Sequence, residues 1–190
     1  MAGKKVVILL GSPRKDGNTA ALAERIAEGA AGAGADVETV CLADLDIAPC
    51  TGCEGCHKPG ADGCVIKDDM QDLYPKLAGA ASIVYASPVY WFTVSAQLKA
   101  AMDRCYGLVG PDGQTHGLAG KRIGLAFTYG ADDAVESGCI NAIRMFQDIF
   151  GFVGSEIVGM VHGSTGAGKI ADNAAVMEKA ADLGRQLVAE

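Results

Sequence analysis

Short apolar segments recur along the chain, and stretches with helical periodicity separate them. The apolar segments, which are typical of buried parallel strands, cover residues 6–10, 37–41, 82–86, 122–128 and 156–161. Helices are predicted where apolar residues recur at three- or four-residue spacing: at Leu22, Ile26 and Ala30, at Met70, Leu73 and Leu77, and over residues 95–106, 134–152 and 171–189. This alternation predicts an α/β fold, with helices on both faces of a parallel sheet.

In such a sheet, ligands bind beyond the carboxyl ends of the strands. The loops after the first, third and fourth strands are therefore candidates for one shared site. The chain shows no internal repeat, low-complexity tract or second domain. We expect residues 1–190 to form one domain, with a cysteine-rich loop at residues 47–67.

Charge and hydropathy limit the kinds of binding partner and the cellular compartment that we expect for this protein. A net charge of −7 argues against nucleic acid and against an anionic membrane surface as partners. No apolar run approaches the roughly 18 residues that cross a bilayer, and the run at residues 6–10 is too short for a signal peptide. Seven cysteines without an export signal are typical of the reducing cytoplasm, where we expect this protein to act.

Four of the cysteines crowd into one loop. Cys50, Cys53, Cys56 and Cys64 are separated by two, two and seven residues. Thiolates at this spacing suit a tetrahedral zinc ion or an iron–sulfur cluster. Free or redox-active thiols are a third reading. From the residues alone, all three readings remain open.

The loop between the first strand and the first helix carries groups that bind phosphate. Side-chain donors, a cation and the backbone amides of a helix start occur together at Ser12, Arg14, Gly17, Asn18 and Thr19. The loop lacks both the spaced glycines of a dinucleotide site and the Gly-Lys-Ser/Thr of a triphosphate site. It therefore predicts a site for a single phosphate monoester, or else an ordinary capped turn. A second glycine-rich segment, residues 163–169, precedes Ile170 instead of Ser or Thr, so we interpret it as a flexible loop.

Two further loops carry aromatic residues or glycine at strand ends. After the third strand come Pro88, Val89, Tyr90, Trp91, Phe92 and Thr93, and after the fourth come Tyr129 and Gly130. Aromatic side chains here could wall a flat heteroaromatic ring, while neighbouring amides supply directional donors. Packing under a helix or into a dimer interface is the alternative interpretation.

Several motifs in this order resemble those of one family. They are Gly-Ser-Pro-Arg at residues 11–14, Asn18-Thr19, the cysteine run, Cys-Val-Ile-Lys-Asp-Asp-Met at 64–70, Ser-Pro-Val-Tyr-Trp at 87–91 and Leu-Lys-Ala-Ala-Met-Asp-Arg at 98–104. The chain resembles NADPH-dependent FMN reductase-like flavoproteins, and within them the iron–sulfur flavoproteins. The resemblance implies a flavodoxin-like fold that binds FMN, with helices on both faces of a five-stranded parallel sheet of order 2-1-3-4-5.

The resemblance also assigns roles to residues. It implies that the FMN phosphate is held by residues of the 12–19 loop (Ser12, Arg14, Gly17, Asn18 and Thr19). It implies that residues 88–93 flank the isoalloxazine ring, with Tyr129 and Gly130 opposite. Cys50, Cys53, Cys56 and Cys64 match the motif that holds a 4Fe–4S cluster. The resemblance further implies a homodimer or homotetramer, in which the cluster of one chain lies near the flavin of a neighbour.

The function that follows is electron transfer through cofactors. We expect an FMN protein that passes electrons from NAD(P)H or a ferredoxin to an acceptor, with no catalytic acid or base from the protein. One alternative is a NAD(P)H-dependent FMN or quinone reductase without a cluster. Another is a redox-sensing module, in which the thiol loop gates contact with a partner.

The remaining chemically active side chains have structural interpretations. We expect His57 to be a solvated loop residue, and His116 and His162 to be structural or on the surface. Asp68 and Asp69 are predicted at a helix start. Lys99, Asp103 and Arg104 have the spacing of local helical ion pairs, and Cys41, Cys105 and Cys139 are expected to be small buried apolar residues.

Overall fold

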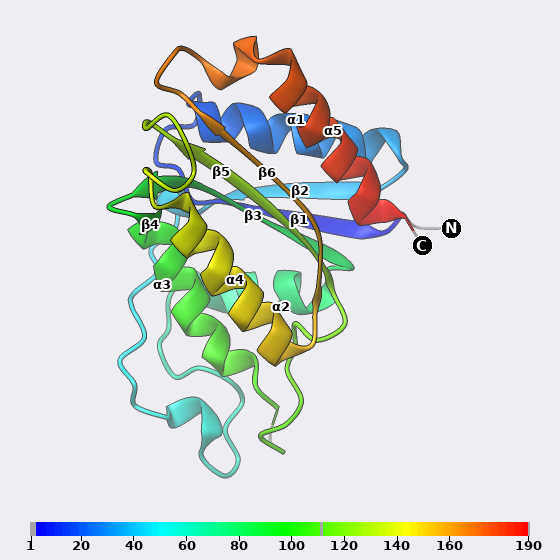
Figure 1. The fold of residues 1–190 in the computed structure, drawn as a ribbon. Coiled ribbons are helices and arrows are strands. Elements are labelled where there is room, and N and C mark those ends of the chain that lie inside the picture. The colour runs from blue at the N-terminus through cyan, green and yellow to red at the C-terminus, as the bar shows by residue number, and fades with distance from the viewer. Residues whose placement is uncertain (1–2, 111, 190) are drawn as a thin grey trace.

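The computed structural model describes residues 3–110 and 112–189. In this part of the chain, five parallel strands form the sheet: β1 (Lys5–Leu10), β2 (Asp36–Cys41), β3 (Ser82–Tyr90), β5 (Arg122–Tyr129) and β6 (Glu156–Ser164). Their spatial order is β2-β1-β3-β5-β6 (Figure 1). A two-residue strand, β4 (Thr93–Val94), pairs with β3 outside this path. Counted without β4, the parallel strands have the predicted order 2-1-3-4-5, so the flavodoxin-like α/β fold is confirmed.

Helices cover both faces of the sheet (Figure 1). Helices α1 (Asn18–Gly32) and α5 (Ala174–Val188) lie on one face, while α2 (Met70–Gly79), α3 (Ala96–Arg104) and α4 (Cys139–Val153) lie on the other. Successive strand residues point to opposite faces, so Val7 and Leu9 join the core under α2–α4. Val6 and Ile8 join the core under α1 and α5. This two-sided burial explains why the central strands read as continuous apolar runs.

The strand register sets the carboxyl ends of neighbouring strands level with one another. Leu10 of β1 pairs with Cys41 of β2 and with Ala86 of β3. Ala86 in turn pairs with Ala126 of β5, which pairs with Val161 of β6. The loops that follow these strands therefore leave the sheet at one edge, where β4 also lies (Figure 1).

Several boundaries differ from the sequence-based prediction, and three of the differences have a clear local cause. Strand β3 continues to Tyr90 instead of ending at residue 86, because its last residues form a hairpin with β4. Helix α4 begins at residue 139 instead of 134, because Gly138 has a φ of +75° and Asp133 accepts two amides in a preceding turn. Helix α5 begins at residue 174 instead of 171, where the Asn173 side chain accepts the amide of Val176.

Short 3₁₀ helices connect the main elements: η1 (Leu42–Asp44), η2 (Gly55–His57), η3 (Cys105–Leu108) and η4 (Ile170–Asp172). Helix η1 follows β2 directly, and the cysteine loop runs from it to α2. In residues 3–110 and 112–189, every helix is too short or too polar to cross a bilayer.

Candidate functional site

The loop after β1 forms a tight turn that leads into the start of α1. Ser12 is buried, and its hydroxyl bonds to both the amide (3.1 Å) and the carbonyl (3.2 Å) of Arg14. The amide of Gly17 donates to the same carbonyl at 3.2 Å. Gly17 is the N-cap of α1, and no described side chain caps this helix end. The first-turn amides and the positive end of the helix dipole are therefore available to an anion, which fits the predicted phosphate site.

Asn18 and Thr19, the first two residues of α1, bond to other loops. Asn18 Oδ1 accepts the amide of Ile170 at 2.9 Å, which joins α1 to the glycine-rich loop after β6. The buried Thr19 hydroxyl lies 2.6 Å from the hydroxyl of Thr128 at the end of β5. These two side chains therefore connect the start of α1 to the end of β5 and to the loop after β6. Their role as direct phosphate donors stays a prediction.

Two serines that the sequence analysis missed connect the first and third loops. Ser95 is buried at the N-cap of α3, where its hydroxyl accepts the Leu98 amide at 3.3 Å and donates to the Gly11 carbonyl at 2.6 Å. The Ser95 amide donates to the Ser87 hydroxyl at 3.0 Å. A Cβ on Gly11 would lie 2.8 Å from Ser95 Oγ, so only glycine permits this approach. A serine directly before a helical pattern is an N-cap signal, and it could have revealed Ser95.

Trp91 and Phe92 form the two-residue turn of the β3–β4 hairpin. Tyr90 pairs with Thr93 across the turn. The φ angles of Trp91 and Phe92 are +48° and +68°, a left-handed conformation that costs non-glycine residues on the order of 1 kcal/mol each. Trp91 is nevertheless 92% exposed and Phe92 55% exposed. Strained, exposed aromatic side chains at the ligand-binding edge fit the predicted ring-binding role.

The start of the predicted aromatic loop belongs to the sheet instead. Pro88 lies within β3 opposite Thr128, and Val89 pairs with Val94 of β4. The prediction of a loop from residue 87 was therefore wrong for residues 87–90. Pro88 lacks an amide proton and cannot donate to the ladder, which made this continuation hard to read.

Tyr129 lies at the end of β5, and its side chain points toward β6. The phenol oxygen is 3.0 Å from Nδ1 of His162, and the Tyr129 carbonyl accepts the Thr165 amide at 2.7 Å. Burial raises the pKa of Tyr129 and lowers that of His162, so both rings are neutral at pH 7. A Cβ added to Gly130 would contact nothing within 4 Å, so space is open beside that backbone.

The cysteine loop extends away from the sheet and past α3, with η2 near its tip (Figure 1). Cys50 and Cys53 are exposed, and Cys56 and Cys64 are half-buried. Burial raises the pKa of Cys56, and the charges of Cys64, Cys50 and Cys53 raise it further. In residues 3–110 and 112–189, no three Cys, His, Asp or Glu side chains converge in metal-binding geometry. The donor set fits a cluster chemically, and the metal role stays a prediction.

Two of these thiols are biased toward the thiolate form. The Gly55 amide, followed by the Thr51 hydroxyl, lowers the pKa of Cys53. Burial alone would raise the pKa of Cys64. Hydrogen bonds from the Ile66 amide and from the side chains of Tyr74 and Arg104 outweigh it, so this pKa is also lowered. Thiolate is the form that binds metals and attacks electrophiles.

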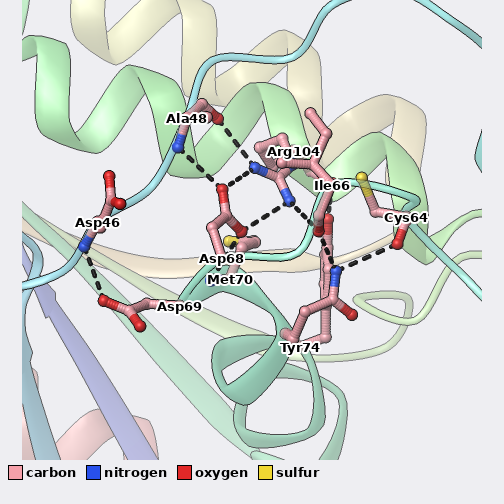
Figure 2. Close-up of polar contacts among 10 residues, drawn as sticks. Asp46, Ala48, Cys64, Ile66, Asp68, Asp69, Met70, Tyr74 and Arg104 are labelled. Atoms are coloured by element: carbon pink, nitrogen blue, oxygen red, sulfur yellow. Dashed lines mark hydrogen bonds and ion pairs between the residues drawn. The ribbon is translucent and has the colours of Figure 1, made fainter.

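The base of the cysteine loop contains a buried ion pair that the sequence analysis did not predict (Figure 2). Arg104 pairs with Asp68, so the prediction of a local helical ion pair for Arg104 was wrong. Lys99 and Asp103 do form such a pair, at 2.6 Å. Helix α2 begins at Met70, directly after the predicted start. Asp69 is the N-cap residue of α2, as predicted, and its side chain accepts the amide of Asp46, on the other side of the loop base, at 2.7 Å.

The other cysteines and histidines are mostly structural. Cys105 and Cys139 are buried as predicted, which raises their pKa values to about 12 and about 11. Cys41 is half-buried. His57 is not a solvated residue, because its ring packs edge-on against Tyr106 with centroids 4.4 Å apart.

The fold and the site together define a flavodoxin-like protein with a predicted phosphate loop (residues 11–19) after β1 and an exposed aromatic hairpin that joins β3 to β4. The family model for NADPH-dependent FMN reductases matches residues 4–169. The chain belongs to the NADPH-dependent FMN reductase family.

Relatives in two archaea carry the name iron-sulfur flavoprotein. The one from Methanocaldococcus jannaschii is 42% identical over 100 residues, which are 53% of this chain and 51% of that protein. The one from Methanosarcina thermophila is 39% identical over 100 residues, with the same two shares. The chain thus spans about half the length of these curated relatives.

A solved structure supports the fold. The NAD(P)H:quinone oxidoreductase from Methanothermobacter marburgensis superposes with a TM-score of 0.77 at 19% identity, covering 100% of this chain and 99% of that chain. At this identity the match establishes the shared flavodoxin-like fold and nothing finer.

Proposed function

We propose that this protein is an FMN-dependent oxidoreductase that passes electrons from NAD(P)H or a reduced ferredoxin, through FMN and a 4Fe–4S cluster, to an acceptor. The observation that carries the proposal is the position of the four-cysteine loop. It leaves the sheet after β2, at the same edge as the phosphate loop of the neighbouring strand β1. The names of the two archaeal relatives support the cluster.

The residues around the candidate flavin site divide into two groups. The loop from Ser12 to Gly17, with Arg14, Asn18 and Thr19, would hold the phosphate through the uncapped amides of α1. The hairpin residues 88–93 and the Tyr129-Gly130 segment would flank the ring. FMN, when bound, accepts a hydride and releases electrons singly, and a 4Fe–4S cluster carries one electron at a time. The side chains bind and orient, and none is assigned as an acid or base.

A homodimer or homotetramer would cover the exposed apolar side chains near the hairpin. Trp91 and Phe92 are exposed there, and so are Val135 and Ile140 around the start of α4. Asn141 Nδ2 donates to the Phe92 carbonyl at 3.1 Å, so the hairpin and α4 form one surface. A second copy docked on this surface would bring a neighbouring chain beside the candidate flavin site, as is needed if one chain's cluster serves a neighbour's flavin. The seven cysteines support a cytoplasmic location.

A second candidate is a NAD(P)H-dependent FMN or quinone reductase without a cluster. The observation in its favour is that the family model for NADPH-dependent FMN reductases matches residues 4–169. In that case the cysteine loop would have a structural or thiol-based role.

Steady-state turnover tests the oxidoreductase proposal. The anaerobically purified, FMN-loaded chain is mixed with NADH, NADPH or reduced ferredoxin and with an artificial electron acceptor. We expect acceptor reduction with at least one donor. If none of the three donors supports turnover, the result would contradict the proposal and favour a redox-sensing module.

The Cys56→Ser variant separates the two candidates. If the cluster carries electrons, the variant keeps its FMN but loses turnover with ferredoxin. If the protein is a reductase without a cluster, the variant turns over NAD(P)H at the wild-type rate with every acceptor.

A further inference from the structure

The Arg104 side chain lies at the C-terminus of α3, buried at the base of the cysteine loop (Figure 2). Its side chain is 0% exposed, and that of its partner Asp68 is 6% exposed. Nη1 donates to Asp68 Oδ2 at 2.5 Å, and Nη2 donates to Asp68 Oδ1 at 3.0 Å. The two parallel bonds are the bidentate arrangement that a guanidinium makes with a carboxylate.

This ion pair holds both ends of the loop. Arg104 Nη1 also donates to the carbonyl of Ala48 at 2.9 Å, two residues before Cys50. Nη2 donates to the carbonyl of Ile66 at 3.4 Å, two residues after Cys64. Asp68 Oδ2 accepts the Ala48 amide at 2.9 Å. One guanidinium therefore joins the two backbone segments that flank the four cysteines.

Neighbouring side chains fix Cys64 in particular. Gln71 Nε2 donates to the carbonyls of Cys64 at 3.1 Å and Ile66 at 2.5 Å. The Tyr74 hydroxyl donates to the Arg104 carbonyl at 3.0 Å. By contrast, the hydrogen bonds of residues 49–63 are local ones, such as that from the His57 amide to the Glu54 carbonyl. The loop is thus fixed at its base and at the backbone of one of its four cysteines.

Stability alone is a weak reason for this arrangement. Burying a charged pair costs about as much in desolvation as the attraction returns, and an apolar pair of similar shape often serves as well. Arg104 Nε is also buried and has no hydrogen-bond partner in the described part of the chain, which adds to the cost. A functional contribution would explain why a guanidinium occupies this position.

We propose that Arg104 is a positioning residue for the metal centre. This inference depends on the cluster of the proposed function. Arg104 holds Cys64 and both ends of the loop at the spacing that a cluster needs. Its pairing with Asp68 sets the charge beside the Cys64 ligand. Interactions of this kind orient ligands and tune the potential of a bound centre.

The test compares three variants of the FMN-loaded chain, each reconstituted anaerobically with iron and sulfide. They are Arg104→Met, Asp68→Asn and Lys121→Met. Lys121 is the matched control, because it is another buried cation, whose amine donates to the carbonyls of Ala78 and Ala80 at 2.7 Å each, at the end of α2. We expect Arg104→Met to hold iron against a chelator roughly tenfold more weakly than wild type. Lys121→Met should hold it as wild type does.

The midpoint potential of the cluster provides a readout that a merely structural role would not move. Arg104→Met leaves the Asp68 charge unpaired beside the cluster and should lower the potential. Asp68→Asn leaves the Arg104 charge unpaired and should raise it. Potentials that stay at the wild-type value, or that move in the same direction in both variants, would overturn the proposal.

Two further measurements keep the proposal testable if a variant or the cluster fails. If Arg104→Met does not fold, as judged by FMN content, Arg104→Lys replaces it. Iron retention equal to wild type in Arg104→Lys would overturn the need for the bidentate guanidinium. If the wild-type chain takes up no iron, the cluster proposal fails. Hydrogen exchange in the FMN-loaded chain then decides whether Arg104 holds the loop. The Ala48 and Met70 amides, which both donate to the Asp68 carboxylate, should exchange faster in Arg104→Met than in Lys121→Met.

Discussion

The Ser95 hydroxyl joins two loops of the candidate site, with one bond to the Gly11 carbonyl and one from the Leu98 amide. Both groups are buried, so no water can replace the hydroxyl without rearrangement. The phosphate loop therefore depends on a residue that does not belong to it. A single side chain can in this way control the geometry of a cofactor site from outside the expected motif.

Replacing Ser95 with alanine should destabilise the protein and weaken FMN binding together. We expect a loss of about 1–2 kcal/mol in the free energy of unfolding, from the lost cap and the unsatisfied Gly11 carbonyl. FMN titration should show weaker binding. The control is Ser155→Ala, which removes a hydroxyl bond to the Leu118 carbonyl away from the site and should leave FMN affinity unchanged. Equal FMN affinity in both variants would show that Ser95 does not shape the phosphate loop.

The Asp68 carboxylate makes stability depend on pH. Its hydrogen bond from Arg104 holds the pKa of Asp68 below the usual value, although burial opposes the shift. Because the unfolded chain binds this proton more readily, the stabilisation is complete above about pH 5 and is lost as the pH falls below about 4. Urea unfolding of wild type and Asp68→Asn across this range should give a shallower pH dependence for the variant. Parallel curves would mean that another group controls the acid sensitivity.

At the scale of elements, the turn of the β3–β4 hairpin exposes two aromatic side chains and has a strained backbone. Its two turn residues have positive φ angles that asparagine and glycine adopt more readily than tryptophan and phenylalanine. The hairpin packs closely against Gly138, because a Cβ added at that glycine would lie only 2.6 Å from Phe92 Cβ. The strained turn is therefore held in place by the segment that leads into α4.

Trp91→Asn should relieve strain and impair the site. We expect the FMN-free protein to be as stable as wild type or more stable by about 0.5–1 kcal/mol. FMN should bind more weakly, because the ring loses an aromatic wall. Phe152→Asn is the control, since Phe152 is equally exposed but lies in the last turn of α4. Unchanged FMN affinity in Trp91→Asn would remove Trp91 from the flavin site.

The sequence predicted those features that depend on neighbouring residues. Apolar runs and helical spacing are local patterns, and they located the five parallel strands, whereas the order of the strands came from the family resemblance. The loops predicted for the site do meet at one edge, because parallel strands end together. The partner of Arg104 could not be read in this way, since 36 residues separate it from Asp68 and the helical pattern offered Lys99 and Asp103 as nearer neighbours. The turn at residues 91–92 was missed because its residue types are unusual for such a conformation.

At the scale of the whole molecule, the two candidate cofactor sites belong to neighbouring strands. The phosphate loop follows β1 and the cysteine loop follows β2, while the aromatic hairpin and the start of α4 present an apolar surface. This arrangement suits an assembly in which copies of the chain bring the centres of different chains together.

Ile140→Lys should weaken this assembly, because it places a charge on the apolar surface. Sedimentation should show a dimer or tetramer for wild type and a shift toward monomer for the variant. Phe152→Lys changes an exposed aromatic elsewhere on α4 and should leave the assembly intact. If Phe152→Lys dissociates it instead, the interface lies on the other end of α4.

The most direct test of the account is the content of FMN, iron and acid-labile sulfide per chain, measured on protein purified without oxygen. We predict one FMN with about four irons and about four sulfides, the stoichiometry of a cluster held by four cysteines. FMN without iron would contradict the cluster and leave a flavin or quinone reductase whose cysteine loop has another role. Absence of both would contradict the cofactor-based function as a whole.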